Sequence, residues 1–128
     1  MAAPVDLTPW AWASCGSLLA WWLAFAVIHA VLTRRGAKDA VKTAHHTTNL
    51  IHAVATCSQC GYVLLLSDEA ATLRSDLYGY SPVVQRAFAI SVGFFAYDLM
   101  WGVIQRDWQF ILHGLLCGLC YVNGATVT

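Results

Sequence analysis

Apolar residues of this chain gather into four segments that are separated by shorter polar stretches. The segments cover residues 9–33, 49–66, 83–104 and 108–122. A helix needs about 20 apolar residues to cross a bilayer, and about 17 is the lower limit. The first and third segments meet this length, and the second and fourth lie near the limit. The pattern predicts an all-α integral membrane bundle of about four transmembrane helices.

Charged residues are distributed unequally between the connections. The first connection carries four basic residues: Arg34, Arg35, Lys38 and Lys42. The second carries three acidic residues and one basic residue: Asp68, Glu69, Asp76 and Arg74. Because Lys and Arg concentrate in cytosolic loops, we expect loop 34–46 and the short connection 105–107 to face the cytosol. Both chain ends would then lie on the opposite side.

Composition supports a membrane location. Hydrophobic residues make up 59% of the 128 residues, charged residues make up 11%, and the mean hydropathy is +0.58. A soluble domain of this size has too little interior to hide so much apolar surface. Seven basic and seven acidic residues balance, so the chain lacks the basic field that attracts nucleic acid. With no repeat or long linker, residues 1–128 are expected to form a single domain.

Ionisable residues inside the apolar segments are informative, because they are costly in a bilayer. Away from the segment ends, where Arg86 lies, each segment contains one such group: His29, His52, Asp98 and His113. At ~1.5 Å of rise per residue, all four lie roughly 7–12 Å from the predicted cytosolic boundary. The connection 105–107 is short enough to make the last two helices antiparallel neighbours. We therefore predict that Asp98 and His113 approach each other.

Two helix faces carry the remaining polar and aromatic candidates. The second segment has a polar stripe at helical spacing: Asn49, His52, Thr56 and Gln59. The third segment places four further residues on one face: Phe94, Tyr97, Asp98 and Trp101. Such faces are expected to point into the bundle or a cavity rather than toward acyl chains. They serve either as hydrogen-bonding contacts between helices or as a binding site.

The cysteines and glycines have simpler interpretations. Two C-x-x-C pairs, Cys57 with Cys60 and Cys117 with Cys120, lie at matching depth in the second and fourth segments. Four thiolates at these positions are geometrically able to hold zinc, but small polarisable side chains are also ordinary packing inside a membrane, so we expect no metal. Gly114 and Gly118 have the spacing that allows close contact with a neighbouring helix.

Residues near the segment ends are expected at the membrane interface. His45 and His46 are adjacent and lie beside the basic loop, so we interpret them as a solvated interfacial pair rather than as ligands. Indole rings favour the same region, and four tryptophans lie near segment ends: Trp10, Trp12, Trp101 and Trp108.

Three of these stretches together resemble the TLC domain, which is shared by translocating-chain-associating membrane proteins, ceramide synthases and lipid-regulating membrane proteins. Asn49-Leu50-Ile51-His52-Ala53 is similar to an early motif of the family that ends in His-Ala. Residues 91–98, Ser-Val-Gly-Phe-Phe-Ala-Tyr-Asp, are similar to its Gly-aromatic-aromatic pattern, and Leu112-His113-Gly114 is similar to its later His-His motif. In this chain the resemblance covers about residues 43–122, and this stretch corresponds to only part of the family domain.

The resemblance implies a multi-pass protein of the endoplasmic reticulum or a related endomembrane that binds membrane lipids or maintains their balance, without a cofactor. The lipid-binding candidates are Asn49, His52, Phe94, Tyr97, Asp98, Trp101 and His113. An alternative is an acyltransferase similar to ceramide synthase, in which His113 is the general base, Asp98 orients it and acyl-CoA is a substrate. Gly114 replaces the second histidine of the motif and weighs against that chemistry. A third alternative is a helix-packing subunit that associates through Gly114 and Gly118.

Overall fold

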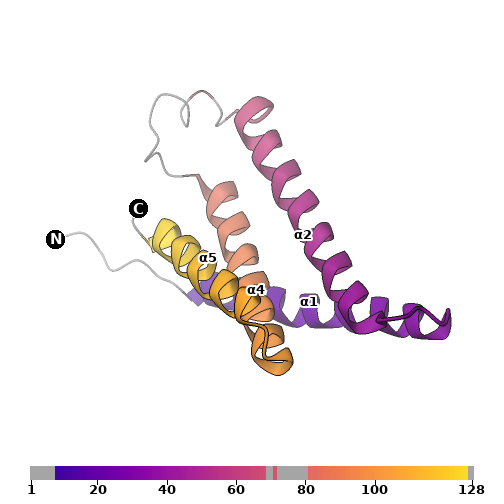
Figure 1. The fold of residues 1–128 in the computed structure, drawn as a ribbon. Helices are drawn as coiled ribbons and strands as arrows, with labels where there is room; N and C mark the ends of the chain where they lie inside the picture. Colours follow the sequence, from indigo (N-terminus) through magenta and orange to yellow (C-terminus); the bar gives the residue numbers. More distant parts are fainter. Residues whose placement is uncertain (1–7, 69–70, 72–80, 127–128) are drawn as a thin grey trace.

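The computed structural model describes residues 8–68, 71 and 81–126, and these residues form four helices and no strand. The helices are α1 (Thr8–Arg34), α2 (Ala40–Leu65), α4 (Pro82–Gln105) and α5 (Trp108–Thr126) (Figure 1). The predicted all-α class is confirmed. Of the second connection, Glu69, Arg74 and Asp76 lie outside the described residues.

Two helices extend beyond the apolar segments that predicted them. α2 begins at Ala40 rather than near residue 49, and α5 ends at Thr126 rather than near residue 122. Backbone hydrogen bonding, not hydropathy, sets the end of a helix, so the polar residues 40–48 continue the helical ladder beyond the apolar span. The extension places His45 within α2 instead of in a solvated loop.

By length and composition, two of the helices are able to cross a membrane. These are Pro9–Arg34, with a mean hydropathy of 1.9, and Pro82–Gln105, with a mean hydropathy of 1.6. α2 and α5 lie outside this group. The predicted bundle is therefore supported as an all-α arrangement with two helices of membrane-spanning character, rather than with four.

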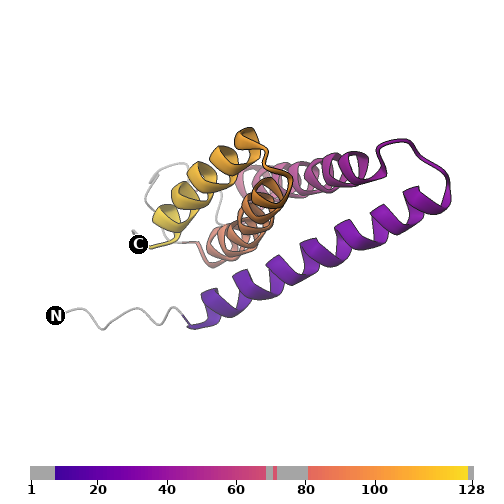
Figure 2. The ribbon, with the colours of Figure 1, turned by 60° about the horizontal axis from the view of Figure 1, so that its bottom comes forward.

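Helix α4 is the centre of the fold and packs against α1, α2 and α5. α1 also packs against α2, and α5 lies along α4 on the side away from α1 (Figure 2). α4 contacts α2 less extensively than it contacts α1 or α5. The buried core consists mainly of α4 residues, including Phe94, Phe95 and Tyr97. Residues of α4 therefore dominate any internal site.

The contact between α1 and α4 depends on one glycine and two serines. A Cβ atom at Gly93 would lie only 2.7 Å from the backbone nitrogen of Leu18. Ser14 and Ser17 donate hydrogen bonds of 3.0 and 2.7 Å to the carbonyls of Ala89 and Ile90. Small residues and hydroxyl hydrogen bonds are typical of helix contacts in membranes, where water does not drive association.

Glycine has the same role between α4 and α5. A Cβ atom at Gly114 would lie 2.7 Å from the nitrogen of Leu99, and one at Gly118 would lie 3.5 Å from Cβ of Phe95. The predicted Gly114–Gly118 contact is thus made within the chain. Gly114 is buried against α4, and association with a separate protein stays a prediction.

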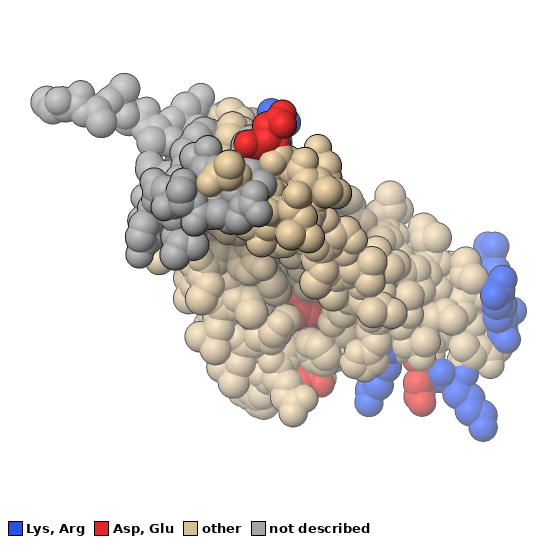
Figure 3. All heavy atoms as spheres, turned by 90° about the horizontal axis from the view of Figure 1, so that it is seen from above, with Lys and Arg blue, Asp and Glu red and all other residues tan. Residues whose placement is uncertain are grey.

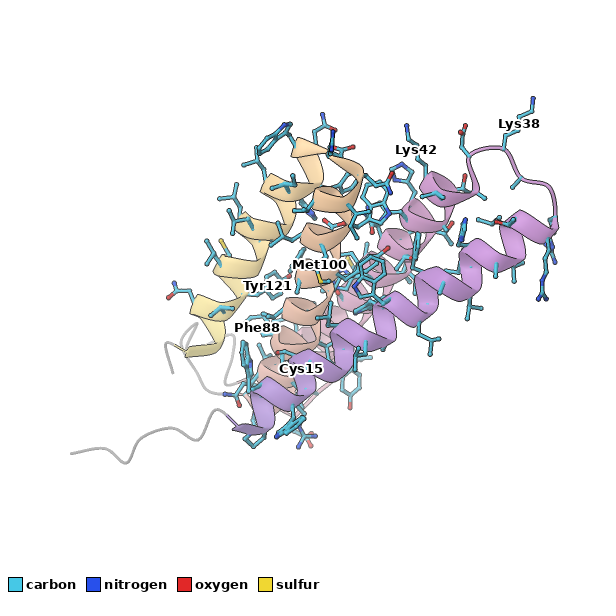
Figure 4. The ribbon with its side chains drawn as sticks, turned by 90° about the horizontal axis from the view of Figure 1, so that it is seen from below. Cys15, Lys38, Lys42, Phe88, Met100 and Tyr121 are labelled. Carbon is cyan, nitrogen blue, oxygen red and sulfur yellow. The ribbon has the colours of Figure 1, made fainter. Side chains whose placement is uncertain are left out.

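Basic residues concentrate at one end of the molecule. Figure 3 shows most Lys and Arg side chains at one end of a largely uncharged surface, and Figure 4 places Lys38 and Lys42 at the connection between α1 and α2. Figure 4 also places Cys15 toward the opposite end of α1. Arg106 belongs to the basic end as well, since His45 near the start of α2 stacks on Trp101 near the end of α4. The cytosolic position of these connections stays a prediction.

Candidate functional site

Asp98 is fully buried and lies between two histidines from different helices. Its Oδ2 accepts a hydrogen bond of 2.7 Å from Nδ1 of His113 on α5. Its Oδ1 lies 3.3 Å from Nε2 of His45 on α2. The predicted approach of Asp98 to His113 is confirmed. The helical ladder and the short turn at residues 106–107 produce it, because α5 must fold back directly along α4.

The expectation that His45 and His46 form a solvated pair is wrong for His45. The side chain of His45 is fully buried, whereas His46 is exposed. The His45 ring stacks on Trp101 with 3.7 Å between centroids, and Phe110 meets it edge-on at 4.6 Å. Trp101, which was expected on the inward face of α4, is 3% exposed and forms one wall of this cage.

The buried network suggests one arrangement of protons. An ionised carboxylate only accepts hydrogen bonds, so an N–H of His45 that faces Asp98 Oδ1 is favourable. The distance between the two atoms is 3.3 Å, but the contact does not have hydrogen-bond geometry, and Oδ1 has no other hydrogen-bond partner. Asn49 lies 3.2 Å from the same His45 nitrogen, and its own amide oxygen has no partner. Exchanging the oxygen and nitrogen positions of the Asn49 amide turns its oxygen toward His45. The N–H at Nε2 of His45 then faces both this oxygen and Oδ1 of Asp98. The Tyr97 hydroxyl then donates to Nδ1 at 3.0 Å.

His52 forms a second polar group, separate from the Asp98 network. Its Nε2 lies 3.2 Å from Oγ1 of Thr56 and 3.4 Å from Oγ of Ser91. The ring stacks on Phe94 with 3.6 Å between centroids, and Trp21 of α1 meets it edge-on at 5.4 Å. The ring is therefore clamped between α1 and α4, with one nitrogen directed at two hydroxyl groups.

A cavity of about 240 Å³ begins beside these hydroxyls. Thr56 and Ser91 line its inner end, and its remaining wall consists mainly of apolar residues from α2 and α4. Phe88 and Tyr121 form the side toward α5, with 5.2 Å between their ring centroids (Figure 4). Exposed Gln59 also contributes to the lining, so the cavity is only partly enclosed.

The predicted polar faces are confirmed as inward-facing, but the predicted lipid-binding residues divide into two sets. Asn49, Tyr97, Asp98 and Trp101 surround His45, and His113 joins them through Asp98. His52 and Phe94 lie at the cavity end of the bundle. His29 joins neither set and stacks on Phe25 of its own helix at 5.8 Å. The cavity wall contains none of the seven predicted lipid-binding residues, including His52 and Phe94.

Two residues were missed by the sequence analysis although their spacing identifies them. His45 precedes Asn49 by four residues and His52 by seven, so it extends the polar stripe of α2 backward. Ser91 precedes Asp98 by seven residues and lies on the same face of α4. Counting the stripe from the start of the helix, instead of from the start of the apolar segment, would have included His45.

The remaining candidate chemistry is a metal site. No group of three or more His, Cys, Asp or Glu residues in the described part of the chain is arranged to hold a metal ion. Cys57, Cys60 and Cys120 are exposed, and Cys117 is partly buried. The geometry therefore offers a buried acid–histidine network and an apolar cavity with a polar inner end.

Comparisons with protein-family models, curated proteins and solved structures find no match to this chain.

Proposed function

We propose that this chain is a multi-pass membrane protein that binds lipid in the cavity between α2 and α4. The proposal first requires that the protein lies in a membrane, and the exposed apolar surface of α1 supports this location. Leu19, Leu23 and Val27 recur at a spacing of four residues and are 71%, 66% and 55% exposed. Apolar stripes of this kind are rarely left facing water. In the proposed arrangement α2 and α5 cross the bilayer beside α1 and α4.

The cavity is the observation that carries the lipid-binding proposal. It lies between two helices whose outer faces are themselves apolar, with Leu50, Val54 and Leu65 of α2 exposed. Lipid is the abundant apolar molecule around such a surface, and a partly enclosed gap between helices admits a chain laterally. Binding sites between the helices of a bundle are a common arrangement. The TLC-like motifs and an endomembrane location remain part of this proposal.

A catalytic role for Asp98 and His113 is the second candidate. The 2.7 Å hydrogen bond fixes the proton of His113 on Nδ1, and the side chain is 51% exposed, so Nε2 is the nitrogen available as a general base. The cavity, however, reaches α5 only at Tyr121, eight residues from His113. Eight residues correspond to about 12 Å along a helix. An acyl group in the cavity would therefore lie far from this base, which favours binding without catalysis.

Lipid extraction from the purified protein, followed by mass spectrometry, tests the proposal. The expected result is retained lipid above the level found with Ala87→Phe, since a phenyl ring at this cavity-lining position fills the space. Ala55→Phe is the matched control, because Ala55 is exposed on α2 and outside the cavity. Equal lipid content in the wild-type protein and both variants would contradict binding in the cavity. Transfer of an acyl group from acyl-CoA, abolished by His113→Ala, would instead favour the acyltransferase.

A further inference from the structure

The size of the cavity limits what it can hold. Its volume of about 240 Å³ is below the ~300–1,000 Å³ of pockets that enclose drug-sized ligands. Between Val84 and Ser91 it extends over seven residues of α4, or about 10 Å along the helix. A single hydrocarbon chain, or part of one, matches this space. The space is too small for both chains of a two-chain lipid.

The charge of the cavity limits the polar group of the ligand. The described residues that line the cavity include no Asp, Glu, Lys, Arg or His. Ser91 lies nine residues from Pro82 at the start of α4, which places it about 13 Å from that end of the helix. A charged head group at this depth would meet no Asp, Glu, Lys, Arg or His in the cavity wall and would be costly. Phosphate and carboxylate groups are therefore disfavoured, whereas an uncharged hydroxyl or carbonyl is accepted.

Hydrogen-bond counting at the inner end favours a polar ligand atom over a purely apolar one. Thr56 and Ser91 both approach the same nitrogen of His52. That nitrogen carries either one lone pair or one proton, so it makes one strong hydrogen bond at a time. The second hydroxyl keeps hydrogen-bonding capacity on the cavity side. Each hydroxyl has one proton and two lone pairs, so its contact with His52 leaves capacity for a ligand atom that donates or accepts in this otherwise apolar setting.

We infer that the cavity selects a single-chain amphiphile with one uncharged hydroxyl or carbonyl group, held at its inner end by Ser91 and Thr56. His52 is a positioning residue, because it contacts both hydroxyls but does not line the cavity. Its stack on Phe94 and its edge contact with Trp21 fix the ring that orients them. This inference rests on the proposed lipid-binding function and adds the chemical class of the ligand.

Photolabelling of the full chain in phosphatidylcholine vesicles tests the inference. The probe is a long-chain alcohol that carries a diazirine, and peptide mass spectrometry locates the label. We expect labelling of α2 and α4 around the cavity, and competition by unlabelled hexadecanol but not by palmitate or by added two-chain lipid. The combined change Ser91→Ala and Thr56→Val should weaken competition by hexadecanol about fivefold to tenfold. Competition by hexadecane, which has no polar atom, should stay unchanged.

Controls separate failure of this inference from failure of the proposed function. Ser58→Ala removes an exposed hydroxyl from the same helix and should leave competition by hexadecanol unchanged. Equal competition by hexadecanol and hexadecane, or stronger competition by palmitate or two-chain lipid, would overturn the inference while retaining a lipid site. Labelling that Ala87→Phe does not reduce would overturn both. Unchanged competition by hexadecane in the double variant shows that the cavity is intact, so loss of folding is recognised.

Discussion

Asp98 on α4 and His113 on α5 share a hydrogen bond of 2.7 Å, although Asp98 is fully buried and the side chain of His113 is 51% exposed. His45 approaches the other carboxylate oxygen at 3.3 Å. The carboxylate is therefore surrounded by two imidazoles from two different helices. Removing one partner leaves a charge in a place where solvation cannot replace it, which makes this network the strongest target for mutation.

Substitution of Asp98 and His113 should show coupling. Asp98→Asn is expected to lower the free energy of unfolding in detergent by about 3 kcal/mol, because it breaks a buried pair. His113→Ala should cost less, about 1 kcal/mol, because this side chain is half exposed and interhelical hydrogen bonds in membranes are modest. The double variant should lose less than the two single losses added together. Strictly additive losses in unfolding experiments would refute an energetic contact between the two residues.

The adjacent histidines of α2 provide a matched pair. His45→Ala should destabilise the protein by about 2–5 kcal/mol, since it removes a buried ring that stacks on Trp101 and a hydrogen bond to Tyr97. His46→Ala should change stability by no more than about 0.5 kcal/mol, because His46 is exposed. Thermal unfolding of both variants in the same detergent measures the difference. Similar melting temperatures for the two variants would mean that His45 is not a core residue.

Glycine substitutions test the close contact of α1 with α4. Gly93→Ala should destabilise the protein by about 1–3 kcal/mol, because the new methyl group overlaps the backbone of α1 near Leu18. Gly61→Ala is the control, since nothing lies within 4 Å of a Cβ atom there. It should be neutral or stabilise the helix by up to about 1 kcal/mol. Equal free energies of unfolding for Gly93→Ala and Gly61→Ala would contradict the close contact of α1 with α4 at Gly93.

Orientation in the membrane can be measured by labelling introduced cysteines from each side. In a variant whose five native cysteines are replaced by alanine, a cysteine at Lys38 should react with an impermeant reagent from the cytosolic side. A cysteine at Asp68 should react only from the opposite side, because the basic residues concentrate around the first connection and not the second. Cytosolic labelling of both positions would exclude the proposed crossing of α2.

The sequence by itself determined the helices and one contact of the site. Apolar segments of sufficient length identified all four helices, because a helix that lacks apolar residues on at least one face has nothing to bury or to present to lipid. The short connection 105–107 also determined that Asp98 meets His113, because antiparallel neighbours joined by a tight turn bring residues of equal depth together. Helical spacing correctly placed Asn49, His52 and Thr56 on one inward face.

Only the tertiary structure decided how these faces meet. Spacing assigns a residue to a face of its own helix, but it does not state which neighbour covers that face or at what angle. Gly93 and Gly114 allow α1 and α5 to approach the backbone of α4 closely, whereas α2 contacts α4 much less extensively. His45 is buried near the start of α2, and the cavity beside Ser91 lies nearer the other end of this helix. Side-chain volumes at helix crossings set such angles, and they act between segments distant in sequence.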